Sequence, residues 1–308
     1  MKTRALTIYL SILAGFFTLL LFSANTENSG ESNWSLLHAD GVDQLPQRIL
    51  SFEMKDSYSF AGEALPLENF DVRERLDREF LVNSYWHSST LLNIKQATRF
   101  FPMIEAILAE EGVPDDFKFL AVAESSLQQV TSPSGAKGVW QFLKDTGASY
   151  GLTINDEIDE RYHVEKATRA ACKMLKDYKK RFGSWTFAAA GYNMGSTSLA
   201  REIENQRADS YFDMNLSDET MRYIFRIVAL KEIITQPEEF GFYLDPEDLY
   251  QPLNEYSVIL VEEPIENWGD FAKEHGTSYR MLKVYNPWLR SYKLSKAPTQ
   301  AIEIRLPK

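Results

Sequence analysis

The sequence predicts a mainly α-helical domain followed by a small C-terminal β-α-α-β domain. From about residue 69 to residue 245, apolar residues recur at helical spacing, and glycines and prolines interrupt the pattern. After Pro237 the pattern changes, and segments 256–261 and 301–307 have the composition and alternation of β-strands. The length of 308 residues accommodates a full enzyme domain plus a smaller module.

Several helices are predicted in the first region. Each has an apolar face, and together they cover about residues 70–81, 94–111, 115–127, 163–182, 185–192 and 218–235. Gly112 and Pro114 interrupt the pattern after the second helix. Asp115 and Asp116 suit the positive end of the dipole at the start of the third helix.

The C-terminal region is predicted to place two short helices between its two strands. These helices are expected at about residues 265–275 and 278–285. Gly276 is placed as the C-cap of the first helix, and Thr277 as the N-cap of the second.

Residues 1–24 are expected to be a signal peptide or an uncleaved membrane anchor. Lys2 and Arg4 precede an apolar run from Ala5 to Phe22, and polar residues follow it. The run is long enough to cross a bilayer, and the small-residue cleavage site is poor, so both interpretations stay open. Both predict export to the periplasm or cell envelope, and the second adds membrane attachment through residues 5–22.

The other domain limits follow from changes in composition. Residues 25–65 are polar, with scattered proline and glycine, and are interpreted as a linker or loosely attached arm. The helical domain is then expected at residues 66–248 and the C-terminal domain at residues 255–308.

Charge and composition argue against several functions. The net charge is -11 and the isoelectric point is about 5.0, which disfavours a nucleic-acid partner because phosphate binding requires clustered Lys and Arg. No metal or cofactor is expected, since the four histidines are scattered along the chain as His38, His87, His163 and His275. Cys172 is interpreted as a small buried residue of a helix rather than a catalytic thiol.

Glu124 is the first candidate catalytic residue. It lies near the C-terminal end of the third predicted helix, whose other residues are apolar on nearly all sides. Burial and the negative end of the helix dipole both raise the pKa of a carboxyl group, which suits a general acid that protonates a glycosidic oxygen. The structural alternative is a buried glutamate that an Arg or Lys neutralises, or a glutamate that reaches solvent at the helix end.

Two later segments contain polar groups suited to binding a sugar. In "SPSGAKGVWQFLKDTGASYGL", which begins at Ser132, Gly138 permits a close backbone approach and Gln141 offers an amide donor and acceptor. In "FAAAGYNMGS", which begins at Phe187, Tyr192 and Asn193 lie at a predicted helix end. The structural alternatives are a helix start with a core tryptophan in the first segment and an asparagine C-cap in the second.

Three motifs together resemble the signature motifs of the soluble lytic transglycosylase catalytic domain, which has a lysozyme-like fold. These motifs are "AVAESSL", "SGAKGVWQF" and "AAGYNMG", and their order and spacing agree with that family. A fourth segment, "ETMRYIFRIVALK", resembles the closing helix of the family and its tyrosine. The resemblance covers about residues 70–245 and is closest to the membrane-bound lytic transglycosylase D branch, in which "DERYHVEKATRAA" also has a counterpart.

The resemblance implies a role for each matching residue. Glu124 corresponds to the catalytic acid/base, and Ser125 to the serine that follows it. The residues matched to positions that line the glycan groove are Ser134, Gln141, Tyr192, Asn193 and Tyr223. Two motifs depart from the family pattern: Val139 replaces a usual leucine, and Gly195-Ser196-Thr197 replaces Gly-Pro-Gly beside the groove.

The implied activity is that of a peptidoglycan lyase acting on the β-1,4 bond between N-acetylmuramic acid (MurNAc) and N-acetylglucosamine (GlcNAc). Glu124 alone would act as acid and then as base, with the muramic 6-hydroxyl as an intramolecular nucleophile, to give 1,6-anhydro ends without water. One alternative is a hydrolytic muramidase, which requires a second carboxylate. The candidates for it, all in polar segments, are Asp145, Asp156, Glu157 and Asp159. Asp159, Glu160 and Arg161 also suit a structural ion-pair cluster. The other alternative is a non-catalytic peptidoglycan-binding scaffold, against which the intact Glu124 argues.

Residues 255–308 resemble a LysM module. The resemblance is carried by "FAKEHGTSYRMLKVYNPWL", which begins at Phe271. It implies binding of GlcNAc polymers, which would hold the enzyme on its peptidoglycan substrate. Glu262-Glu263-Pro264 stands where the family usually has Gly-Asp, and a small docking domain is the structural alternative.

Overall fold

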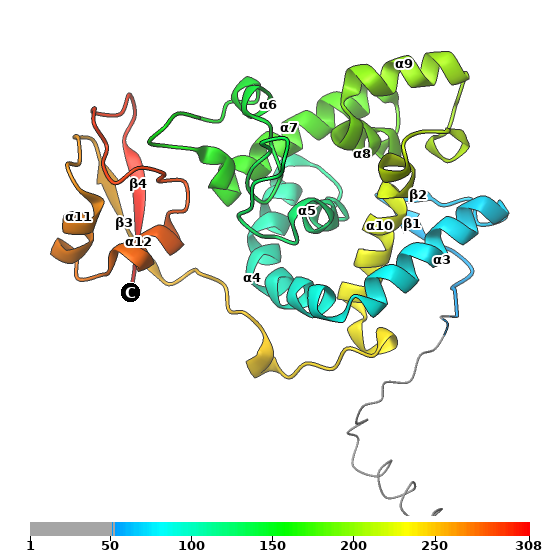
Figure 1. Cartoon of the computed structure of the whole chain (residues 1–308), viewed down its shortest axis with the longest axis horizontal. Helices are drawn as coiled ribbons and strands as arrows, with labels where there is room; N and C mark the ends of the chain where they lie inside the picture. The colour runs from blue at the N-terminus through cyan, green and yellow to red at the C-terminus, as the bar shows by residue number, and fades with distance from the viewer. Residues whose placement is uncertain (1–50, 52) are drawn as a thin grey trace, which may run out of the picture. The chain divides into compact units, whose positions relative to one another are not determined.

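The helical region is organised around one short apolar helix, α5 (Phe117–Ser125). The computed structural model describes residue 51 and residues 53–308, and in it α5 packs against α4 (His87–Glu111) and α10 (Asp218–Thr235) (Figure 1). Most of the α5 residues are buried, as the sequence predicted. A helix that is apolar on nearly all sides is stable only inside a core, so its neighbours must enclose it.

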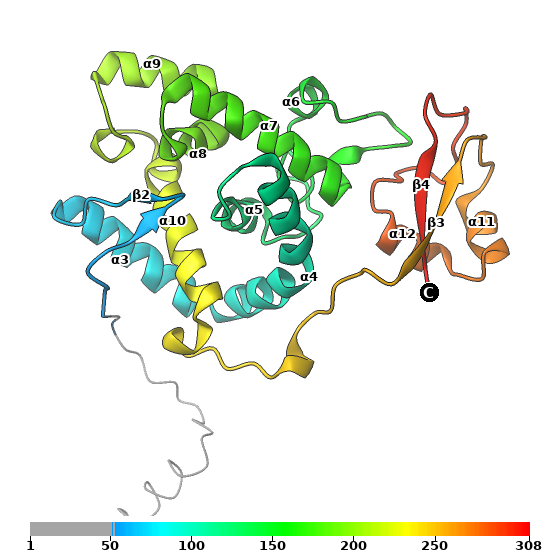
Figure 2. The same ribbon diagram turned by 180° about the vertical axis from the view of Figure 1, so that it is seen from behind.

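The remaining helices surround this centre. α3 (Phe70–Tyr85) packs along α10, and α7 (Val164–Phe182) packs against α4 and α8 (Trp185–Met194) (Figure 2). Two short helices, α6 (Lys144–Ser149) and α9 (Ser196–Gln206), were not predicted. Each buries a single residue, Gly147 in α6 and Leu199 in α9, so neither has the broad apolar face that marks a longer helix in the sequence.

Helix boundaries were predicted well where a cap marks them. α10 has the predicted bounds, and Ser217 caps it by accepting a hydrogen bond from the Thr220 N–H. α4 begins at His87, earlier than predicted, because Trp86 alone separates it from α3. No glycine or proline marks this change of direction.

The interpretation of residues 25–65 as a loose arm is wrong at the C-terminal end of that segment. Strands β1 (Ser59–Phe60) and β2 (Glu63–Ala64) form a hairpin, and Phe60 is fully buried with its ring centroid 5.1 Å from that of Phe117. The apolar residues of this hairpin are few and isolated in a polar stretch, so no periodicity revealed them. The hairpin is part of the core of the helical region.

The predicted export segment lies outside the described residues. Among the residues that the structure describes, none of the helices is both long and apolar enough to cross a bilayer.

The C-terminal residues form the predicted β-α-α-β unit. β3 (Tyr256–Val261) pairs antiparallel with β4 (Ile302–Pro307), and α11 (Trp268–Glu274) and α12 (Tyr279–Tyr285) lie between them in sequence. Its core is formed by buried apolar residues that include Trp268, Ala272, Leu282, Trp288 and Ile304.

The caps of this unit differ by one residue from the prediction. Ser278, not Thr277, caps α12, and its hydroxyl accepts a hydrogen bond from the Met281 N–H at 3.2 Å. Thr277 instead donates its backbone N–H to Ala272 O, which closes the end of α11. His275 is the C-cap of α11, and Gly276 follows it with a positive φ of 72°.

The C-terminal unit contacts the segment that precedes α7. The Asp159 N–H donates to Trp288 O at 2.9 Å, and the Arg290 N–H donates to Glu157 O at 2.8 Å. Ile158 is buried in the same apolar cluster as the core of the C-terminal unit. Backbone hydrogen bonds and a shared apolar cluster therefore join the two regions.

We expect Phe60→Ala to lower the free energy of unfolding by about 3–5 kcal/mol, because it leaves a cavity against Phe117. Chemical denaturation followed by circular dichroism measures this change. Phe70→Ala is the matched control, since Phe70 is 74% exposed. Equal effects of the two substitutions would show that the hairpin does not contribute to the core.

Candidate active site

Glu124 lies at the C-terminal end of α5, where the helix stops because Ser126 adopts a left-handed conformation with φ of 53°. Glu124 as a whole is half-buried. The buried Tyr223 of α10 donates its hydroxyl to Glu124 Oε1. The packing of α5 against α10 thus joins two candidate residues that are 99 positions apart in sequence.

The environment of Glu124 holds its pKa at about 7. Burial raises the pKa because the charged form loses water, and the hydrogen bond from Tyr223 opposes that change. The negative charge of Glu219 raises the pKa further, whereas the positive charge of Arg226 lowers it. The direction agrees with the sequence-based expectation, and a large fraction of Glu124 is protonated at neutral pH.

The second motif, "SGAKGVWQF", forms a tight loop beside the C-terminal end of α5. Gly138 has φ of 77°, and a Cβ atom there would lie 1.9 Å from Arg161 O, so the predicted close backbone approach is confirmed. Trp140 is fully buried and donates Nε1–H to Thr168 Oγ1 at 2.8 Å, which is the core tryptophan of the structural alternative. Ser125 donates its hydroxyl to Val139 O at 2.8 Å and ties α5 to this loop.

A buried ion pair between Arg161 and Asp159 stabilises the same loop. Arg161 donates to both carboxylate oxygens of Asp159, at 2.8 and 2.7 Å, and also to Gly135 O and Phe142 O, both at 3.2 Å. Burial alone would raise the pKa of Asp159, but the hydrogen bonds and charge of Arg161 outweigh burial and lower it. The predicted structural ion-pair cluster is confirmed.

The end of α8 is fixed between this loop and α10. Tyr192 donates its hydroxyl to Trp140 O at 2.6 Å. Asn193 Oδ1 accepts from the Thr220 hydroxyl at 2.8 Å, and Asn193 Nδ2 lies 3.5 Å from Glu219 Oε1. Gly195, not Asn193, occupies the C-cap position, so the asparagine is available for a role other than capping.

The other predicted groove residues are engaged within the loop. Gln141 has φ of 49° and donates Nε2–H to Gly138 O at 2.7 Å. Ser134 is exposed, with its hydroxyl 2.9 Å from that of Ser132. The structure thus brings Glu124 together with Tyr223, while Ser125, Ser134 and Gln141 stabilise the loop. The substrate-binding roles of these residues stay predictions.

Glu219 and Thr220 also belong to the site, and neither was predicted from the sequence. Glu219 lies four residues before Tyr223 in α10, so helical spacing places both on one face, and this signal was visible in the sequence. Thr220 is 2% exposed, and its contact with Asn193 depends on tertiary packing that the sequence does not show.

The four candidate second carboxylates have other environments. Asp145 and Asp156 are exposed, Glu157 accepts hydrogen bonds from the Ser295 N–H, and Asp159 is paired with Arg161. Within residues 53–308, no group of three or more His, Cys, Asp or Glu side chains is arranged to hold a metal ion. Cys172 is buried, and burial raises its thiol pKa to about 12, which does not suit a nucleophile.

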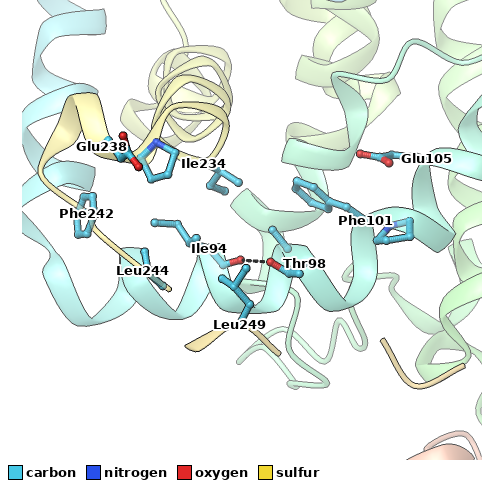
Figure 3. Close-up of a pocket in the computed structure, with 12 residues that line it drawn as sticks. Ile94, Thr98, Phe101, Glu105, Ile234, Glu238, Phe242, Leu244 and Leu249 are labelled. Atoms are coloured by element: carbon cyan, nitrogen blue, oxygen red, sulfur yellow. Dashed lines mark hydrogen bonds between the residues drawn. The ribbon is translucent and has the colours of Figure 1, made fainter. Parts of the chain in front are cut away.

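Two cavities lie elsewhere in the fold, and Glu124 lines neither. Figure 3 shows the smaller, of about 410 Å³, where apolar side chains of α4 such as Ile94 face Ile234 and Phe242. Glu105 and Glu238 lie at its sides. The larger cavity, of about 580 Å³, lies between α4, the start of α7 and the C-terminal unit.

Comparison with protein families gives two matches. Residues 101–215 match the transglycosylase SLT domain, and residues 257–308 match the soluble lytic transglycosylase C-terminal LysM-like domain. These matches confirm the predicted fold class, a helical lysozyme-like domain followed by a small LysM-like domain. The first match includes Glu124 and ends before Tyr223.

Two relatives are both named membrane-bound lytic murein transglycosylase D, one from Escherichia coli strain K12 and one from Escherichia coli O6:H1 strain CFT073. Each is 26% identical to this chain over 258 residues, which cover 81% of this chain and 55% of the relative. The chain therefore spans about half the length of the curated relatives it matches.

We expect Tyr223→Phe to raise the pKa of Glu124, because it removes the hydrogen bond that favours the carboxylate. Titration of the glutamate side-chain carboxyl carbons by ¹³C NMR measures this shift. Tyr192→Phe removes a nearby hydroxyl that donates to Trp140 O, and it should leave the pKa of Glu124 nearly unchanged. An unchanged or lower pKa in Tyr223→Phe would contradict this assignment.

Proposed function

We propose that this chain, which carries a transglycosylase SLT domain and a C-terminal LysM-like domain, is a lytic transglycosylase of peptidoglycan. It cleaves the β-1,4 bond between MurNAc and GlcNAc, and Glu124 is its single acid/base. The observation that carries this proposal is the pKa of about 7 at a carboxyl group that accepts a hydrogen bond from the neutral Tyr223. Such a group is able both to donate and to accept a proton near neutral pH.

In the first step, protonated Glu124 donates its proton to the glycosidic oxygen, and the bond from that oxygen to muramic C1 breaks. The carboxylate that forms is stabilised by the Tyr223 hydroxyl. The substrate acetamide stabilises the positive charge at C1, and Asn193 supplies an amide to position it, since Asn193 Nδ2 has only a long contact of 3.5 Å with Glu219.

In the second step, the Glu124 carboxylate accepts the proton of the muramic 6-hydroxyl while that oxygen attacks C1. The new C1–O6 bond closes the 1,6-anhydro ring, and Glu124 returns to its protonated state. Because the nucleophile belongs to the same sugar, its effective concentration is high and no second carboxylate is required.

Hydrolysis is the competing reaction, and Glu219 is the residue that would support it. Its charge acts on Glu124, and it lies one helical turn before Tyr223. A muramidase would use this carboxylate to activate water. The exposure of Glu219 favours a solvated acid instead, and the chemical ends of the products distinguish the two reactions.

The substrate class also sets the proposed location. Peptidoglycan lies outside the cytoplasmic membrane, so the proposal includes export through residues 1–24, with membrane attachment through residues 5–22 if that segment is not cleaved. The LysM-like domain at residues 255–308 would hold the enzyme on the glycan and raise the local concentration of substrate.

Digestion of purified sacculi followed by mass spectrometry of the muropeptide ends tests this function. We expect the wild type to release 1,6-anhydro ends and Glu124→Gln to release them about 10²–10⁴-fold more slowly, since the substitution removes the general acid. Asp145→Asn, at an exposed acid, is the control and should retain activity. Reducing ends from the wild type would indicate a muramidase, and an absence of products would indicate a scaffold.

A further inference from the structure

The larger cavity concentrates positive charge. It has a volume of about 580 Å³ and lies where α12 and β4 of the C-terminal unit meet α4 and the start of α7. Its cationic lining residues are Arg99, Arg280, Lys283, Arg290 and Arg305, and its one acidic lining residue is Glu165. In a chain with a net charge of -11, this local excess of cations is opposite in sign to the rest of the molecule.

Most of this charge is not neutralised by the protein. Arg305 pairs with Glu165 at 2.6 Å. Within residues 53–308, no carboxylate lies within 4 Å of the side-chain nitrogens of the other four cations. Lys283 donates hydrogen bonds to Leu289 O and to Ser291 O. Its pKa is lowered to about 8, mainly by burial and to a smaller extent by the positive charge of Arg290. Neighbouring cations that have no carboxylate partner favour the binding of an anion between them.

The other walls of the cavity offer aromatic and amide groups to a peptide ligand. The rings of Tyr279 and Tyr292 stack with centroids 5.7 Å apart, and Tyr292 is 72% exposed, so its ring is accessible at the cavity rim. Gln96 and Gln129 also line the cavity, and the Oε1 atom of each is buried without a hydrogen-bond donor in the described part of the chain. Rotation of the Gln96 amide would offer an acceptor to a peptide N–H, whereas Gln129 Nε2 donates to Tyr162 O at 3.0 Å, which holds that amide in place.

We propose that this cavity binds the peptide stems of peptidoglycan through their carboxylates. Arg280 and Arg290 hold the carboxylates at the exposed edge, Lys283 holds one deeper in the cavity, and the Gln96 amide receives a peptide N–H group. The carboxylates of a short peptide are spaced along its chain, so they are able to pair with cations that lie on separate elements of the cavity wall. The acidic balance of the chain disfavours a long polyphosphate in the same place. The identity of the ligand rests on the proposed function.

This site gives the C-terminal unit a second means of recognising its substrate. The unit would select strands that still carry peptides, in addition to any contact that it makes with GlcNAc. Strands from which the stems have been removed would lose this contribution and dissociate faster.

Binding is tested with the full chain carrying Glu124→Gln, so that the ligand is not cleaved. The Trp288 indole N–H resonance reports the cavity, because Trp288 lines it. The ligands are a GlcNAc–MurNAc–tetrapeptide, the same disaccharide without peptide, and inorganic phosphate. The variant is the pair Arg280→Glu and Arg290→Glu. The matched control is Lys273→Glu, an exposed lysine of α11 outside the cavity.

We expect the peptide-bearing ligand to bind at least about tenfold more weakly to the double variant than to the Lys273→Glu control. The disaccharide without peptide, which keeps only the lactyl carboxylate of MurNAc, should bind about tenfold more weakly than the peptide-bearing ligand and shift the Trp288 resonance less. Equal affinities in the double variant and the control would overturn the proposal. So would an equal response to the disaccharide alone, which indicates a glycan site, or to phosphate, which indicates an unselective anion site.

The same double variant separates this proposal from the proposed function. Without Glu124→Gln, it should still release 1,6-anhydro ends from sacculi, because neither arginine contacts Glu124. Loss of anhydro ends in Glu124→Gln with unchanged peptide binding in the double variant would reject only the peptide site. Peptide binding that depends on the arginines, without anhydro products from the wild type, would reject only the transglycosylase.

Discussion

The hydrogen bond from Tyr223 to Glu124 is the interaction on which the site depends. A carboxyl group at the end of an apolar helix is destabilised in its charged form, and the nature of its nearest donor decides how far its pKa moves. A guanidinium group at this position would ionise the acid well below neutral pH. A neutral hydroxyl compensates burial only in part, so the pKa of Glu124 stays at about 7. The more remote Arg226 exerts a smaller effect than burial or Tyr223.

The rest of the helical region fixes α5 at both ends. At its start, Asp116 accepts from the Ala61 N–H at 2.7 Å and from Lys231 Nζ at 2.8 Å, which attaches the N-terminal hairpin and α10. At its finish, Ser125 donates to the loop that Gly138 allows to pass close to Arg161. Asp116 and Ser125 therefore hold α5 in position. Among the predicted groove residues, only Tyr223 contacts the Glu124 carboxyl group directly.

The sequence predicted those features that depend on local chemistry. The bounds of α10 and β3 follow from a cap and from strand composition, and the apolar character of α5 identified Glu124. The hairpin around Phe60 was not predicted, because its buried residues show no periodicity. Tyr223 was named only through a family resemblance, since no local pattern connects positions 99 residues apart. The cationic cavity was not predicted, because its cations come from α4, α12, β4 and the loop between α12 and β4 and meet only in the folded chain.

The pH dependence of kcat/KM for release of soluble muropeptides from sacculi tests the central claim most directly. This quantity reports the ionisation of the free enzyme, in which Glu124 must carry its proton to act as the acid. We expect kcat/KM to fall as the pH rises through about 7, where Glu124 loses that proton. A value of kcat/KM that stays constant or increases between about pH 6 and pH 8 would contradict the assignment of Glu124 as the catalytic acid.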